Sequence, residues 1–173
     1  MGSGSPSKVP ATAIVRAIAL GALAVGVLDG LDAIVVWALR GVGPQRVFQG
    51  IAAGLLGPGA FQLGAPAAVL GLALHFLIAT VVVAVYVLAS RALPALLRRP
   101  VICGASYGVA VWLVMNFAVI PLAFDRAPRF SVVMVANGLF AHVFLVGLPA
   151  TWAARRADRA PERVALAAEP HGS

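Results

Sequence analysis

Four long apolar stretches constrain the fold of this chain more than any other feature. They cover residues 11–39, 66–90, 101–123 and 131–154. A helix needs about 20 mostly apolar residues to cross the hydrocarbon core of a bilayer, because each residue adds about 1.5 Å to its length. Backbone polar groups in lipid must find their hydrogen-bond partners within the protein, which favours helices. The sequence therefore predicts an all-α integral membrane protein, a bundle of four transmembrane helices.

Composition agrees with a chain whose main partner is the lipid bilayer. Hydrophobic residues make up 61% of the 173 residues and charged residues 11%, whereas soluble domains carry about 25% charged residues. A net charge of +7 would suggest nucleic acid as the partner of a soluble domain. Here the arginines lie at the ends of apolar stretches, where they meet lipid headgroups. We therefore expect no nucleic acid partner.

The distribution of basic residues predicts the orientation of the chain, because cytoplasmic loops are enriched in lysine and arginine. Both termini are therefore expected to be cytoplasmic. Residues 1–10 are predicted to be a flexible tail, and residues 157–173 a disordered cytoplasmic tail. Nine basic residues fall on the side of the termini and four on the other: Lys8, Arg16, Arg91, Arg98, Arg99, Arg155, Arg156, Arg159 and Arg163 against Arg40, Arg46, Arg126 and Arg129.

A shorter segment, residues 44–61, lies between the first two predicted spans. The break at Gly57, Pro58 and Gly59 leaves about 13 residues that can form a helix, which is too short to cross a bilayer. The segment is therefore predicted to be an interfacial helix or a re-entrant one that dips into the bilayer and returns. If it dips inward, these three residues become a lid or hinge over the polar residues described next.

Five polar side chains interrupt the predicted spans at one common depth: Asp29, Asp32, His75, Asn116 and His142. Counted from the outer end of each helix, their depths agree within about 5 Å. A charged aspartate that faced lipid would cost at least a few kcal/mol, which favours an inward orientation. The sequence therefore predicts an outer-leaflet cluster that binds a ligand or protons. Glycines beside these residues predict close helix packing: Gly26, Gly30, Gly71, Gly104, Gly108 and Gly138.

Three roles remain open for this cluster. Intramembrane aspartate and histidine are the usual groups for handling protons or small solutes, although four spans make a poor transporter unless the chain forms a homo-oligomer. His75 and His142 also suit a transition metal, or the axial positions of a haem iron. The third role is purely structural, with the polar groups only holding the helices together. Hydrolytic catalysis is least favoured, because Ser90 and Ser106 lie near the inner side, away from both histidines, so no nucleophile is paired with a base.

The order and spacing of residues over 66–156 resembles that of the YagU-type proteins, a largely uncharacterised family of the bacterial inner membrane. This resemblance implies a polytopic protein of the bacterial inner (cytoplasmic) membrane and no defined reaction. It includes His75 and His142 as recurring positions, whereas the region of Asp29 and Asp32 has little correspondence. The residues that carry it are Gly71, His75, Tyr86, Leu93, Pro94, Gly104, Gly108, Pro121, Gly138, His142, Arg155 and Arg156.

Overall fold

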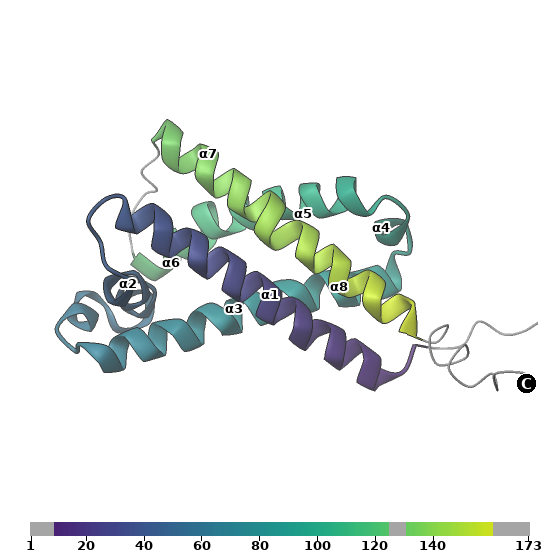
Figure 1. Ribbon diagram of the computed structural model, residues 1–173, viewed down its shortest axis with the longest axis horizontal. Coiled ribbons are helices and arrows are strands. Elements are labelled where there is room, and N and C mark those ends of the chain that lie inside the picture. The colour runs from purple at the N-terminus through teal and green to yellow at the C-terminus, as the bar shows by residue number, and fades with distance from the viewer. Residues whose placement is uncertain (1–8, 125–130, 161–173) are drawn as a thin grey trace, which may run out of the picture.

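The computed structural model describes residues 9–124 and 131–160, and within them four helical paths are long and apolar enough to cross a bilayer. Two are single helices, α1 (Ala11–Ala38) and α3 (Ala65–Ala92). The third, Pro100–Phe124, and the fourth, Val132–Asp158, are each built from three consecutive segments. These helices lie side by side (Figure 1). The predicted four-helix membrane bundle is therefore confirmed. The observed span boundaries differ most from the predicted ones in the fourth span, which continues to Asp158.

Each composite span contains a π-helical segment, a turn that holds one residue more than an α-helical turn. The third span consists of α5 (Pro100–Val114), the π segment η2 (Met115–Val119) and α6 (Ile120–Phe124). The fourth consists of α7 (Val132–Phe140), the π segment η3 (Ala141–Gly147) and α8 (Leu148–Asp158). A proline follows each π segment closely, Pro121 and Pro149. A proline ring clashes with the carbonyl four residues earlier, so the preceding turn widens.

The two ends of the bundle differ. The start of α1 and the end of α8 lie together at one end (Figure 1), which we call the terminal end. The short helix α4 (Ala95–Arg98) joins α3 to α5 there. At the opposite end, which we call the α2 end, lie α2 (Pro44–Leu56) and the 3-10 helix η1 (Pro58–Phe61).

The predicted short helix is α2, and it crosses the direction of the spans. It is seen nearly end-on in Figure 1, where the long helices run across the view. Its buried residues are Val47, Gln49, Ala52 and Ala53, and Ala52 and Ala53 pack with Ala67 of α3. The helix ends at Gly57, whose φ of +70° favours glycine. This crosswise position matches the interfacial alternative for the segment better than the re-entrant one.

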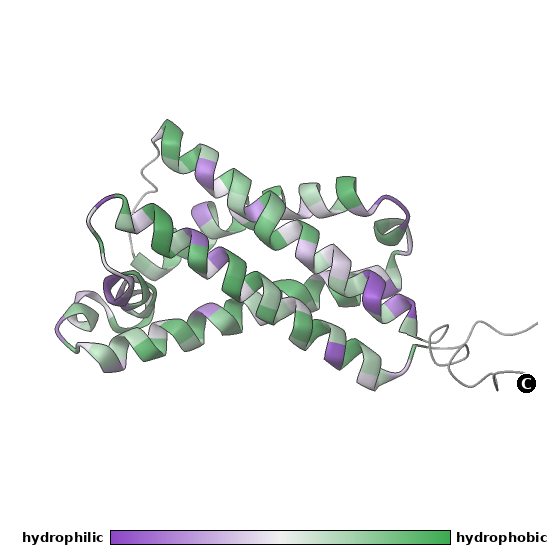
Figure 2. Ribbon diagram, viewed as in Figure 1, coloured by the Kyte–Doolittle hydropathy of each residue, from purple (hydrophilic) through white to green (hydrophobic). Residues whose placement is uncertain are grey.

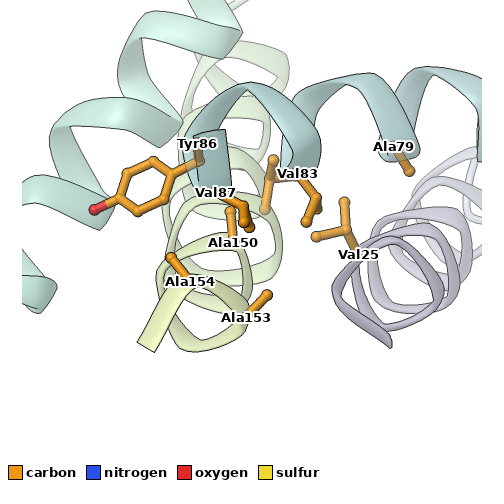
Figure 3. Close-up of a cluster of buried hydrophobic side chains, with 9 residues drawn as sticks. Val25, Ala79, Val83, Tyr86, Val87, Ala150, Ala153 and Ala154 are labelled. Carbon is orange, nitrogen blue, oxygen red and sulfur yellow. The ribbon is translucent and has the colours of Figure 1, made fainter. Parts of the chain in front are cut away.

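Small side chains form the apolar core between α1, α3 and the fourth span. Figure 3 shows Val83 and Val87 of α3 beside Ala150 of α8, with Val25 of α1 nearby. Large apolar side chains instead lie on the outside of the bundle, and most of the ribbon in the spans is coloured hydrophobic in Figure 2. Leu31, for example, is 55% exposed. An outer surface of this kind fits lipid rather than water. The core consists of Val25, Ala79, Val83, Tyr86, Val87, Val146, Ala150, Ala153 and Ala154.

Glycines allow the helix backbones to touch at three places in the bundle. A Cβ atom added to Gly71 would collide with the carbonyl oxygen of Phe48 in α2. One added to Gly108 would collide with the carbonyl oxygen of His142, and one added to Gly147 with that of Gly104. Close backbone approach of this kind is how small residues hold membrane helices together. Gly71, Gly104 and Gly108 were among the positions predicted to pack in this way.

Aromatic and basic side chains mark both ends of the bundle. At the α2 end, the guanidinium of Arg40 lies 5.9 Å from the ring centroid of Trp37. At the terminal end, that of Arg156 lies 5.5 Å from the ring of Trp152. Pairs of tryptophan and arginine are typical of the two membrane–water interfaces. Their positions are consistent with a bilayer whose normal runs along the spans.

Replacement of Gly108 by alanine tests the backbone contact between α5 and η3. We expect Gly108→Ala to lower the free energy of unfolding by about 1–3 kcal/mol, because the new methyl group must displace the His142 backbone. Gly50→Ala is the matched control, since no atom lies within 4 Å of an added Cβ there. The control should be neutral or stabilising by about 0.5–1 kcal/mol. Unfolding by SDS in mixed micelles, followed by circular dichroism, measures both, and equal stability of the two variants would contradict the contact.

Candidate functional site: a polar cluster between three spans

Asp29 lies at the centre of a polar cluster that joins three spans. Its half-buried carboxyl group lies within electrostatic range of the imidazoles of His142 and His75 and of the Asp32 carboxyl group. The depths agree, because Asp29 lies nine residues before the end of α1 at Ala38. His75 and His142 each lie ten residues after the start of their spans, at Ala65 and Val132. The structure thus brings together four of the five predicted residues.

His75 joins α3 to α1 through a hydrogen bond across the helix interface. Its Nε2 atom lies 2.8 Å from the carbonyl oxygen of Gly26. A carbonyl oxygen only accepts hydrogen bonds, so Nε2 carries the proton and donates, and Nδ1 keeps the lone pair of a neutral ring. Gly30 is also part of this contact, since a Cβ added there would lie 3.2 Å from Nε2. The ring also packs edge-on against Phe48 of α2, at 6.2 Å between centroids.

His142 occupies the second position of the π segment η3. Its Nδ1 atom donates to the carbonyl oxygen of Gly138, four residues earlier, at 2.9 Å. Where an α-helix passes into a π-helix, backbone N–H groups reach one residue further back, so one carbonyl loses its usual helical donor. The imidazole supplies a donor at this junction. With Nδ1 protonated, Nε2 is the nitrogen of the neutral ring that retains a lone pair.

Asn116 has the same local geometry and does not join the cluster through any hydrogen bond of the described residues. It is the second residue of η2, and its Nδ2 atom donates to the carbonyl oxygen of Trp112, four residues earlier, at 2.9 Å. This amide therefore stabilises the α-to-π junction of the third span. Asn116 lies eight residues before the end of the third span at Phe124, but depth alone does not determine where the side chain finds its partner.

Asn137 is a member of the cluster that sequence analysis missed. Its Nδ2 atom donates to Oδ2 of Asp32 at 2.9 Å, which links α7 to α1. The same depth count could have found this residue, because Asn137 lies five residues after the start of α7 and Asp32 six before the end of α1. The two aspartates therefore differ in their hydrogen bonding, because Asp32 accepts a hydrogen bond from an amide of another helix.

The Asp29 carboxylate has no hydrogen bond from any residue in the described ranges, 9–124 and 131–160. Within those ranges, every fully enclosed side-chain nitrogen or oxygen has a hydrogen-bond partner. The oxygens of Asp29 are therefore not sealed inside the protein. An accessible carboxylate at this depth can accept a proton or a hydrogen bond from a small ligand, and the two nearby imidazoles can share that proton.

The predicted lid residues lie away from this centre. Gly57 ends α2, while Pro58 and Gly59 are exposed residues of η1. The neighbouring Ala60 is fully buried and packs with Ala52 and Ala67, so η1 folds back on α2 and α3. The contact between this region and the cluster comes from α2 itself, through Phe48 and the His75 ring.

The donor arrangement gives little support to a metal site. Among the described residues, no three histidine, cysteine, aspartate or glutamate side chains converge as metal ligands. His75 and His142 each give one ring nitrogen to a backbone carbonyl, which leaves one nitrogen per ring for a transition metal or a haem iron. Histidine ligands often donate their second N–H to a carbonyl in this way, but the geometry does not complete a ligand set.

Comparison with known proteins identifies no relative: no family model matches the chain, and no curated protein or solved structure matches it. The interpretation of the cluster therefore rests on the chemistry and positions of its own residues. The resemblance to the YagU-type proteins stays a prediction from residue spacing.

A double-mutant cycle tests the hydrogen bond between Asp32 and Asn137. We expect the Asp32→Leu and Asn137→Leu substitutions to show a coupling energy of about 1 kcal/mol in unfolding, which is typical of an interhelical bond in a membrane protein. The same cycle with Asp32→Leu and Asn116→Leu is the control and should show coupling near zero, because Asn116 bonds to its own helix. Equal coupling in the two cycles would show that Asn137 has no special link to Asp32.

Proposed function

We propose that this polytopic membrane protein binds protons or a small ligand at the polar cluster, on the outer side of a bacterial inner membrane. The observation that carries the proposal is the Asp29 carboxylate, which is accessible at membrane depth and lies in range of two imidazoles. Ionisable groups inside a membrane are costly and are usually kept for function. Asp32 has a structural role, since Asn137 already binds it.

Proton exchange at this cluster follows from the hydrogen bonds of the two histidines. One nitrogen of each ring is fixed as a donor to a carbonyl, so an incoming proton has two nitrogen acceptors, Nδ1 of His75 and Nε2 of His142. The third acceptor is the carboxylate of Asp29. An imidazole can gain and lose a proton, so proton uptake from the outer side would change the charge of the cluster. A small ligand with hydrogen-bond donors would use the same acceptors.

An apolar layer separates the cluster from the terminal end of the bundle. One helical turn from Asp29, His75 and His142 towards that end lie Val25, Ala79 and Val146, respectively. All three belong to the buried apolar core. A polar group or a water chain would be needed there for a continuous proton path. This layer favours a binding site that is accessible from one side over a path through a single chain, so transport would require a homo-oligomer.

The orientation is part of the proposal and follows the positive-inside rule. Arg91, Arg98 and Arg155 lie at the terminal end, which we assign to the cytoplasm, so the α2 end faces outward. A cysteine placed at the exposed Gln45 of α2, in a Cys103→Ser background, should react with a membrane-impermeant maleimide when the outer face is accessible. Protection there, together with labelling from the cytoplasmic side, would reverse the orientation. Membership of the YagU-type family belongs to the same proposal and is supported by residue spacing.

Fluorescence of Trp112 can report protonation of His142. A Cβ atom added to Gly138 would lie 2.5 Å from the indole Nε1 of Trp112, and the Gly138 carbonyl accepts the His142 hydrogen bond. With Trp37→Phe and Trp152→Phe, Trp112 is the one tryptophan left in the sequence. We expect its emission to change reversibly with pH as the His142 ring gains and loses a proton.

The matched variants of this experiment are His142→Gln and His171→Gln. His142→Gln should abolish the pH dependence while the far-UV circular dichroism remains that of a folded bundle. His171→Gln, in the predicted tail, should leave it unchanged. Emission that does not depend on pH, or that responds equally in His142→Gln, would contradict proton binding at the cluster.

A further inference from the structure

A second site lies at the terminal end, independent of the polar cluster. A pocket of about 310 Å³ opens between the start of α5 and the fourth span. Its lining is of two kinds. Val101, Leu148 and Trp152 provide an apolar wall, and the polar part consists of Thr151 and three arginines, Arg155, Arg156 and Arg159. The same part of α8 is strongly hydrophilic in Figure 2.

The positive charge of this pocket is not neutralised by an ion pair in the described ranges. In the part of the chain that the structure describes, the acidic residue beside the arginines is Asp158, which lies 2.9 Å from Arg91 Nη1 of α3 and forms its ion pair there. Arg156 instead lies over the ring of Trp152. Three guanidinium groups that have no carboxylate partner within residues 9–124 and 131–160 attract an anion, and guanidinium binds phosphate with two hydrogen bonds at once.

The apolar wall of the pocket continues onto the surface that faces lipid. Val101 is 67% exposed and Trp152 48% exposed, and both lie on spans that cross the bilayer. Just beyond the pocket, α5 and η3 are in backbone contact at Gly104 and Gly147. This contact closes the pocket towards the bilayer centre, so an occupant enters from the side or from the terminal end.

We infer that this pocket binds the headgroup of an anionic phospholipid. The phosphate lies against Arg155, Arg156 and Arg159, and the first part of an acyl chain runs along Val101, Leu148 and Trp152. Basic pockets between transmembrane helices are typical sites for anionic lipid headgroups. A soluble phosphate ion would use the arginines and leave the apolar wall uncovered, so the shape and chemistry together favour a lipid.

The test is a lipid titration of the full chain in detergent micelles, followed by native mass spectrometry. Phosphatidylglycerol is compared with phosphatidylcholine of the same acyl chains. We expect tighter binding of phosphatidylglycerol, and an affinity about 30-fold lower in Arg155→Gln/Arg156→Gln, because each basic residue near the surface contributes about 1 kcal/mol. Arg16→Gln/Arg98→Gln is the matched control. It removes the same charge at the same end from two exposed residues outside the pocket and should lower affinity less than about threefold.

Val101→Trp tests the pocket without any change of charge. This exposed position accepts a large side chain, which would occupy the apolar wall, and phosphatidylglycerol affinity should fall while the protein remains folded by circular dichroism. Equal losses of phosphatidylglycerol affinity in Arg155→Gln/Arg156→Gln and in Arg16→Gln/Arg98→Gln would overturn the assignment. Full affinity in Val101→Trp would overturn it as well. Inorganic phosphate titrated alone distinguishes the two sources of phosphate. If inorganic phosphate raised the thermal stability of the protein as much as phosphatidylglycerol does, the occupant of the pocket would be a soluble anion and not a lipid.

Discussion

Backbone contact at glycine residues sets the distances between helices on which the rest of this structure depends. Without a side chain at Gly26 and Gly30, α3 approaches α1 closely enough for His75 to reach a backbone carbonyl. The same principle brings α5 against the backbone of His142 at Gly108. Lipid offers no hydrophobic driving force between helices, so packing and interhelical hydrogen bonds must hold them. The polar cluster therefore forms because the helices that carry it touch.

Some polar groups of the cluster stabilise the structure, and others remain available as proton or hydrogen-bond acceptors. The Asn137 bond to Asp32 and the His75 bond to Gly26 join helices, whereas the His142 bond to Gly138 stabilises its own span. These bonds leave the Asp29 carboxylate and one nitrogen per imidazole as acceptors, and these three groups come from three spans. One helical turn further towards the terminal end, each span carries an apolar residue of the buried core: Val25, Ala79 and Val146. A polar layer over an apolar one is the arrangement expected of a site that binds from one side.

Hydrophobicity and depth along the chain predicted most of this arrangement. The four spans, the short helix before the second one and the common level of Asp29, His75 and His142 follow from the period and rise of helices. Two features did not follow. The π segments depend on how the chain relaxes around Pro121 and Pro149, and they direct the side chain of Asn116 to its own helix. Asn137 was missed although it is an amide like Asn116, because it lies only five residues after the start of its span, nearer the span end than the level on which the depth count centred.

The measurement that tests the central claim most directly is imidazole nitrogen NMR of the protein in lipid bilayers. Selective ¹⁵N labelling of histidine, in a His171→Gln background, leaves signals from His75 and His142. If Asp29 shares protons with both rings, Asp29→Asn will change the pH titration of both histidines, whereas Asn116→Asp will leave them nearly as they are in the unsubstituted chain. Titration of both rings that is unaffected by Asp29→Asn would contradict a shared proton site and leave the cluster a structural one.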